Sequence, residues 1–186
     1  MHLILASGSP RRKELIREIT ADFSVEPSFF EETGEGLSAR DTVLAFARGK
    51  AEEVAGRFPG ALVVGADTVV CLDGEILGKP KNADGAKKML RRLSGRTHTV
   101  FTGVCVVYGG KTRTRAVASD VTFHRLSEAL IERYVASGHP LDKAGAYGIQ
   151  DGFPIVERYE GSFTNIVGLP VEETRELIEQ AIVDAQ

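Results

Sequence analysis

The sequence lacks several features that mark common classes of protein. Its two cysteines, Cys71 and Cys105, have no metal-ligand spacing, and none of its four histidines is spaced with another as zinc ligands are. Both cysteines lie within apolar runs, which predicts two buried thiols in a reducing compartment, with a disulfide as the alternative. A zinc site built from cysteine and histidine is therefore not expected.

Long apolar runs are also missing. No run approaches the roughly 20 residues that a membrane-spanning helix requires, and the N-terminus begins with a short strand-like run and has no signal-peptide pattern. The formal net charge of -3 disfavours a protein that binds nucleic acid through bulk charge. We therefore expect a cytoplasmic protein with no membrane contact and no nucleic-acid partner.

Familiar motifs for nucleotide binding and covalent catalysis are missing as well. The chain has no G-x-x-x-x-G-K-[ST] loop, which excludes a Walker A site. It has no G-x-S-x-G motif and no cysteine–histidine arrangement, so nothing supports a protein nucleophile. The pattern Gly34-x-Gly36-x-x-Ala39 imitates a dinucleotide fingerprint, but it follows no strand and is set aside.

The length and the order of elements indicate the fold class. A chain of 186 residues that is 42% hydrophobic suits one domain over residues 1–186, or two small lobes that share a core. Periodicity predicts strands at 3–5, 23–25, 61–66, 69–72, 75–77, 98–108, 111–123 and 155–159, with an interruption at Asp67-Thr68, and helices at 10–19, 39–58, 83–93, 127–137 and 171–183. Loops are expected at 28–36 and 161–170. Hairpins mixed with long helices predict an α/β fold with a mixed sheet.

A basic segment lies where the first strand passes into the first helix. Ser9 suits the N-cap and Pro10 the first helical position. Arg11, Arg12 and Lys13 then crowd the first turn, where each exposed positive charge should cost roughly 0.3–1 kcal/mol against the helix dipole. A polyphosphate held by backbone amides and arginine side chains would explain this arrangement, with Ser7 and Ser9 as further donors. A solvated basic turn is the alternative.

Asp67 is the most informative carboxylate. It lies inside an apolar strand pattern, where an unpaired charge is costly. It would be a metal ligand or a base for water, or else an aspartate that caps a turn or pairs with a buried base. Hydrolysis of a phosphoanhydride needs water, a divalent cation and positive charge on the phosphates. The other candidates are Glu31 or Glu32 as a second carboxylate, and Arg11, Arg12, Lys50 and Lys79 as cations.

Several stretches of the sequence form a set whose order and spacing extend over nearly the whole chain. They are 5–15 (LASGSPRRKEL), 47–51 (ARGKA), 65–70 (GADTVV), 78–80 (GKP), 93–98 (LSGRTH), 102–104 (TGV), 142–150 (DKAGAYGIQ) and 165–170 (NIVGLP). Together these stretches resemble the Maf family of nucleoside triphosphate pyrophosphatases.

The resemblance implies a fold and a reaction. The fold would be the Maf/ITPase-like elongated mixed sheet flanked by helices, with two lobes and a central cleft. The reaction would convert a nucleoside triphosphate into the monophosphate and pyrophosphate with a divalent cation, Mg²⁺ or Mn²⁺, in a homodimer. The family's proton acceptor falls on Asp67, and its acid on Glu31 or Glu32. Its phosphate-facing cations fall on Arg11, Arg12, Lys50 and Lys79, and its positions for substrate choice on Arg11, Thr68 and Gln150.

The stretch that ends at Gln150 resembles the branch of the family that prefers dTTP and UTP. A side-chain amide offers a donor and an acceptor, which suits O4 and N3–H of thymine or uracil. Asp151 follows directly, where family members commonly carry glycine. The alternatives are a related enzyme with another base preference, such as 7-methyl-GTP, and a nucleotide-binding regulator of cell division without turnover.

Overall fold

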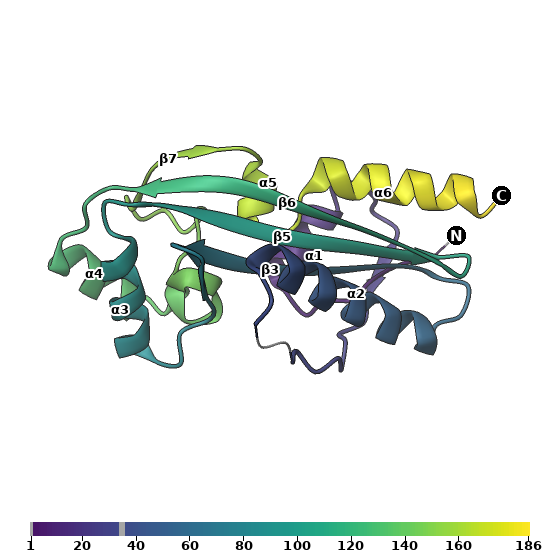
Figure 1. The fold of residues 1–186 in the computed structure, drawn as a ribbon, viewed down its shortest axis with the longest axis horizontal. Helices are drawn as coiled ribbons and strands as arrows, with labels where there is room; N and C mark the ends of the chain where they lie inside the picture. The colour runs from purple at the N-terminus through teal and green to yellow at the C-terminus, as the bar shows by residue number, and fades with distance from the viewer. Residues whose placement is uncertain (1, 34–35) are drawn as a thin grey trace.

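The computed structural model describes residues 2–33 and 36–186 of the chain, and one mixed sheet runs through it (Figure 1). The strands follow the order β2-β1-β3-β5-β6-β7, and β4 pairs with β3. Both β1 pairings are parallel, and the remaining pairings are antiparallel. The strands are β1 (Leu3–Leu5), β2 (Phe23–Val25), β3 (Leu62–Leu72), β4 (Glu75–Leu77), β5 (Thr97–Tyr108), β6 (Lys111–Phe123) and β7 (Val156–Glu160).

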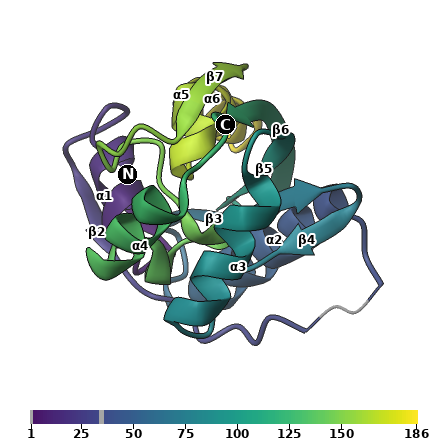
Figure 2. The same cartoon turned by 90° about the vertical axis from the view of Figure 1, so that its left-hand side faces the viewer.

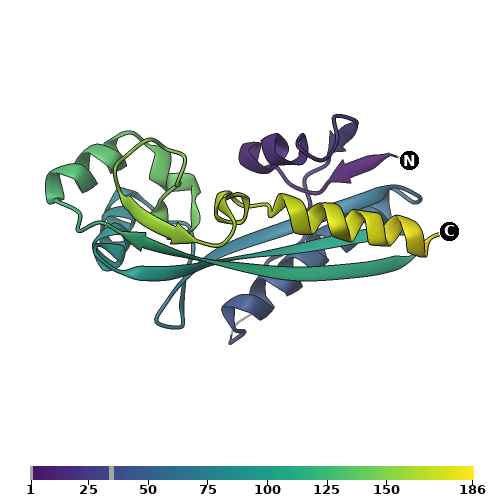
Figure 3. The same cartoon turned by 90° about the horizontal axis from the view of Figure 1, so that it is seen from above.

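Helices cover the sheet in two groups, as Figures 1 and 3 show. The helices α3 and α4 lie at one end of the long strands, while α1, α2 and α6 lie toward the other, where the chain ends. The α-helices are α1 (Pro10–Ile16), α2 (Ala39–Arg57), α3 (Ala83–Leu93), α4 (Glu128–Ala136), α5 (Phe163–Val167) and α6 (Val171–Asp184), and 3-10 turns span His139–Asp142 and Ala144–Ala146. Among the described helices, none has the length and apolarity to cross a bilayer.

Alternation along β3 explains how the two faces of the sheet are used. Val63 faces α2 and packs with Ala47, Ala51 and Val54, whereas Val64 packs on the opposite face with α1 and α6. Figure 2 shows α2 and α6 on different sides of the long strands. Successive side chains of a strand point to opposite faces. Asp67 therefore lies on the α2 face, and Thr68 lies on the face of α1 and α5.

A gap in the sheet sets the position of the site. The strand β1 pairs with residues 62–64 of β3, and β4 pairs with residues 70–72. Between them, residues 65–69 of β3 have β5 on one side and no strand of the described chain on the other. A strand edge left open in the middle of a sheet gives side chains of both faces access to one cleft.

Two glycines let α2 approach the sheet closely. A Cβ atom on Gly65 would lie 2.5 Å from the carbonyl oxygen of Ala47. A Cβ atom on Gly103 of the neighbouring strand would collide with the backbone of Val43. Since Lys50 lies on the same helix, these two glycines also set the distance between that lysine and β3.

We predict that Gly103→Ala destabilises the protein by about 1–3 kcal/mol, because the helix backbone cannot yield without loss of packing. The matched control is Gly56→Ala, a helical position of α2 with open space around it. That change should stabilise by about 0.5 kcal/mol, since alanine favours a helix. Chemical unfolding of both variants measures the difference, and equal stabilities would contradict the close approach of α2.

The sequence predictions for the fold are confirmed, with four differences. The first helix ends at Ile16, because the hydrogen bonds tighten there: the amide of Arg17 donates to the Glu14 carbonyl and the amide of Glu18 to the Leu15 carbonyl. The expected loop at 161–170 contains α5, which is too short to show a period. The strand β3 runs unbroken through Asp67.

Both cysteines are free, and Cys71 is half-buried because it lies beside the β4 hairpin. The expected loop at 28–36 includes residues 34 and 35, which lie outside the described residues.

Candidate active site

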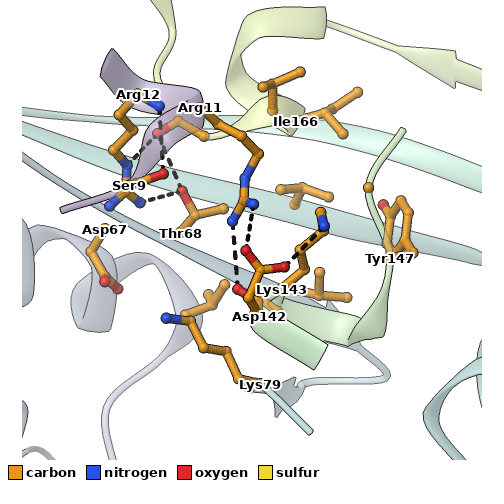
Figure 4. A pocket seen from close by; sticks show the side chains of 18 of the residues that line it. Ser9, Arg11, Arg12, Asp67, Thr68, Lys79, Asp142, Lys143, Tyr147 and Ile166 are labelled. Atoms are coloured by element: carbon orange, nitrogen blue, oxygen red, sulfur yellow. Dashed lines mark hydrogen bonds and ion pairs between the residues drawn. The ribbon is translucent and has the colours of Figure 1, made fainter. Parts of the chain in front are cut away.

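A cavity of about 430 Å³ occupies the gap between β1 and β4 (Figure 4). Its size is in the range of ligand pockets in proteins. The lining comes from both ends of the fold: the start of α1, the α2 face, β3, the loop after β4, the 3-10 turns and α5. Polar members of this lining include Ser9, Arg11, Arg12, Glu32, Lys50, Asp67, Thr68, Lys79, Asp142 and Gln150.

Two carboxylates meet at one lysine on the α2 side of the cavity. Lys50 Nζ lies 2.7 Å from Oδ1 of Asp67 and 2.6 Å from Oε1 of Glu32. Asp67 is only 8% exposed, so the lysine supplies the charge partner that a buried carboxylate needs. Each of these contacts uses one oxygen of its carboxylate, which leaves the second oxygen available to another partner. Glu31 does not line the cavity, so the structure brings Glu32 to Asp67 and not its neighbour.

The carboxylates at Lys50 are the candidate ligands for a divalent cation. Within residues 2–33 and 36–186 no group of three or more metal-ligating side chains occurs. Mg²⁺ is commonly held by one or two carboxylates together with substrate phosphates and water. Asp67 and Glu32 converge on one ammonium and supply hard oxygen donors. The residues therefore fit a cation shared with a phosphate ligand, and they do not form an all-protein metal cage.

Arg12 is fixed on the opposite side of β3. Its Nε donates to the carbonyl of Gly168 at 2.8 Å, Nη2 to Oγ1 of Thr68 at 3.0 Å, and Nη1 to Oγ of Ser7 at 3.4 Å. Burial lowers the pKa of Arg12, and the charge of Asp67 acts in the opposite direction. Ser7 is buried and absent from the cavity wall, so its hydroxyl supports the arginine from behind.

Arg11 crosses the mouth of the cavity to the 3-10 turn. Its Nη1 donates to Oδ2 of Asp142 at 2.9 Å, as Figure 4 shows. Burial alone would raise the pKa of Asp142, but hydrogen bonds from Arg11 and Lys143 lower it to about 2. Lys79 lies on the wall below Asp142 in Figure 4 and has no ion-pair partner among the described residues. The cavity thus gathers cations from two separate parts of the fold.

The side chains of Tyr134 and Lys143 hold the loop that ends at Gln150 in place. Tyr134 donates its hydroxyl proton to Oδ2 of Asp151 at 2.6 Å and accepts the amide of Gly148 at 2.9 Å. Lys143 Nζ lies 3.5 Å from the same carboxylate oxygen. Asp151, which stands where the resemblance led us to expect glycine, is therefore a buried anchor of this turn. Gln150 lies next to it, exposed, on the cavity wall.

A buried histidine supports the aromatic wall of the cavity. His98 Nε2 lies 2.7 Å from the hydroxyl oxygen of Tyr147, and both rings pack edge-on against Phe123. Burial lowers the pKa of His98 from 6.5 to about 4, while the charge of Asp120 acts in the opposite direction. The folded protein therefore keeps this histidine neutral at a pH where the unfolded chain is already protonated.

We predict that acidification weakens the fold through His98. Between pH 6.5 and pH 4 the unfolded state binds the proton and the folded state does not, so the free energy of unfolding falls as pH falls. A shift from 6.5 to about 4 corresponds to a loss on the order of 3 kcal/mol. Thermal unfolding across this range should show a shallower pH dependence for His98→Gln, with exposed His124→Gln as the matched control. The same slope in His98→Gln and the wild type would contradict this account.

The structure brings most of the predicted site residues to one cavity. Ser9, Thr68 and Gln150 line it together with the cations and the carboxylates, whereas Ser7 and Glu31 do not. Sequence reasoning gave no role to Asp142 or to the Gly168 carbonyl. Asp142 had a usable signal, since it opens the 142–150 stretch. The Gly168 carbonyl had none, because a backbone oxygen leaves no trace in residue type. Fold and site together define an α/β protein with a cleft for a polyanion beside a pair of carboxylates.

Comparison with known proteins identifies the family. A family model described as Maf-like protein matches residues 2–181. The chain is 50% identical over 182 residues to the dTTP/UTP pyrophosphatase of Myxococcus xanthus, covering 96% of this chain and 92% of that protein. It is 46% identical over 179 residues to the dTTP/UTP pyrophosphatase of Shouchella clausii, covering 95% and 94%. The chain belongs to the Maf family.

A solved structure shows a related fold at low identity. The Staphylococcus aureus Ham1 protein superposes with a TM-score of 0.50 at 17% identity, over 67% of this chain and 73% of that chain. This likeness agrees with the expected elongated mixed sheet with helices on both faces. It concerns the fold alone.

Proposed function

We propose that this protein hydrolyses dTTP and UTP to the nucleoside monophosphate and pyrophosphate. The observation that carries the proposal is the cavity itself, where Asp67 and Glu32 meet at Lys50 while Arg11, Arg12 and Lys79 line the same space. The substrate follows from the relatives, whose names give dTTP/UTP pyrophosphatase. A single Maf-like domain over residues 1–186 is part of this proposal.

The chemistry follows from the charges. Water attacks the α phosphorus, the bond from that phosphorus to the bridging oxygen breaks, and pyrophosphate leaves with the bridging oxygen. Asp67 accepts the proton of the attacking water, and Lys50 holds this carboxylate in place at 2.7 Å. Arg12 and Lys79 stabilise the negative charge that gathers on the phosphate oxygens and the leaving group.

A divalent cation belongs to this proposal. Asp67 and Glu32 are the residues that would hold Mg²⁺ or Mn²⁺, which would supply Lewis-acid polarisation of the phosphate oxygens. Lys50 contacts both carboxylates and so holds them near each other. Of the two acidic residues expected from the sequence, Glu32 is the one that we assign to this role.

Base choice is assigned to Gln150 and Thr68, which both line the cavity. The Gln150 amide can donate to O4 of thymine or uracil, and the Thr68 oxygen is the partner that we assign to N3–H. Asp151 and Tyr134 fix the turn that carries Gln150, which limits how the amide can be presented. The 7-methyl-GTP alternative is less well supported, because neither of the relatives described above carries that name.

The test is product release from a panel of dTTP, UTP, CTP, dATP, GTP and 7-methyl-GTP, with Mg²⁺, with Mn²⁺ and with chelator. We expect monophosphate and pyrophosphate from dTTP and UTP, and no turnover with chelator. The variant Gln150→Glu should lower kcat/KM for UTP by about tenfold, since one hydrogen bond to the base is lost. Turnover centred on 7-methyl-GTP would overturn the base assignment. Saturable binding without turnover would favour the regulator of cell division.

Two further expectations go with this function. A cytoplasmic location is proposed, because Cys71 and Cys105 are both free thiols, as expected in a reducing compartment. A homodimer is proposed from the family resemblance. Light scattering on the purified protein measures the mass directly, and a mass near the 20.1 kDa of one chain would contradict the dimer.

A further inference from the structure

A chain of hydrogen bonds links the cavity to a buried threonine that does not line it. Arg12 Nη2 donates to Oγ1 of Thr68 at 3.0 Å. Oγ1 of Thr68 lies 2.9 Å from Oγ1 of Thr102, its partner across β3 and β5. Thr102 then donates to the backbone carbonyl of Asn165 at 2.9 Å. Thr102 is 0% exposed, so water cannot take part in these bonds from outside.

The end of this chain fixes the direction of every bond in it. A carbonyl oxygen can only accept, so the one hydroxyl proton of Thr102 is committed to Asn165. The short contact between the two threonine oxygens then requires the proton of Thr68, because two lone pairs at 2.9 Å would repel each other. The other possible acceptor for Thr68 is the Gly168 carbonyl at 3.5 Å, which already accepts Nε of Arg12 at 2.8 Å. Thr68 is therefore a donor toward Thr102.

Thr68 has consequently no proton left for a ligand. One lone pair of its oxygen accepts from Arg12, its proton points at Thr102, and one lone pair remains. Thr68 lines the cavity, as does Gly168, whose carbonyl lies 3.5 Å from the Thr68 hydroxyl oxygen. Toward any ligand in the cavity this hydroxyl is an acceptor only. A ligand group that faces it must bring a hydrogen-bond donor.

We infer that Thr102 is a positioning residue that determines base specificity through Thr68. The inference rests on the proposed function. Uracil and thymine each carry a single N–H donor in a nucleotide, at N3, whereas cytosine has a lone pair at N3. An acceptor-only Thr68 pairs with N3–H and meets the cytosine N3 lone pair unfavourably. Buried polar groups that lose their partner give strong discrimination between otherwise similar bases.

The experiment compares Thr102→Val with Thr102→Ser. Valine has nearly the shape of threonine and ends the hydrogen-bond chain, so the Thr68 proton becomes free to turn toward the ligand. Serine keeps the hydroxyl and the chain. The readouts are kcat and KM for UTP, CTP, dTTP and dCTP, and the dissociation constants of α,β-methylene-UTP and α,β-methylene-CTP. Thr102→Cys, whose thiol is a weak donor and acceptor, is the second variant if the valine protein does not fold.

We expect Thr102→Val to reduce the UTP-to-CTP ratio of kcat/KM by about tenfold, through KM rather than kcat. The reason is that Thr68 can then face the base as a hydrogen-bond donor and not only as an acceptor. Thr102→Ser should keep the wild-type ratio within about twofold. Thr102→Cys should shift the ratio in the direction of valine.

Three results would overturn the role of Thr102. They are an unchanged ratio in Thr102→Val, an equal shift in Thr102→Ser, and a wild type without preference for UTP over CTP. The binding constants keep this test separate from the proposed function. Absence of turnover with a wild-type preference for the UTP analogue, lost in Thr102→Val, would overturn the enzyme and leave Thr102 in its role.

Discussion

Replacing Asp67 by asparagine is expected to lower kcat by about a thousandfold, the effect typical of removing a general base. Asparagine has the shape of aspartate, and its side-chain oxygen can still accept from Lys50, so the fold should be retained. What is lost is the basic oxygen that accepts the proton of water and the charge that a divalent cation requires. Steady-state rates with dTTP and thermal unfolding of the same preparation separate loss of chemistry from loss of structure.

The matched control for this variant is Glu52→Gln. Glu52 lies on α2 close in sequence to Lys50, but it pairs with Arg48 and does not line the cavity. Its replacement should leave kcat within about twofold, because a surface ion pair contributes little. If Asp67→Asn retained most of the wild-type rate with Mg²⁺ present, the assignment of the base would be wrong.

Replacing Arg12 by lysine is expected to lower kcat/KM by about a hundredfold, as for loss of a preorganised charge at a reacting phosphate. The guanidinium contacts Gly168, Thr68 and Ser7 with three different nitrogens. An ammonium is a single point charge and cannot keep these three contacts while it faces the phosphates. The loss should therefore appear even though the positive charge is conserved.

Lys13→Ala is the control for Arg12→Lys. Lys13 also lies on α1 and carries the same charge, but it is exposed and outside the cavity. Its removal should leave kcat/KM nearly unchanged. Equal activity of Arg12→Lys and the wild type would show that the positive charge alone suffices and that the fixed geometry of Arg12 does not contribute to kcat/KM. Thermal unfolding of Arg12→Lys checks that the contact with Gly168 is not needed for folding.

The sequence was sufficient to predict that Lys50 and Asp67 lie near each other. An apolar strand pattern interrupted by one aspartate, and a helix with one lysine beside its apolar stripe, put both groups near the same interface. Glu32 was not separable from Glu31, because a loop has no period that says which side chain points inward. Its place became evident only from the contact with Lys50.

The hydrogen-bond chain through Thr102 could not be predicted from the sequence. It depends on the register of β3 against β5, which sets Thr68 opposite Thr102. A shift of two residues would leave every side chain on its own face, so the alternation of polar and apolar residues does not determine this register. The chain also ends on α5, a helix of five residues inside an expected loop. Backbone carbonyls, such as that of Asn165, carry no signal in residue type.

The most direct test of the account is the identity of the products formed from dTTP. The protein is incubated with dTTP and Mg²⁺ or Mn²⁺, and the nucleotide and phosphate products are separated and quantified. Water attack at the α phosphorus predicts dTMP and pyrophosphate in equal amounts, with both absent in Asp67→Asn. Formation of dTDP and inorganic phosphate would place the attack at the γ phosphorus and contradict the proposed function of this cavity.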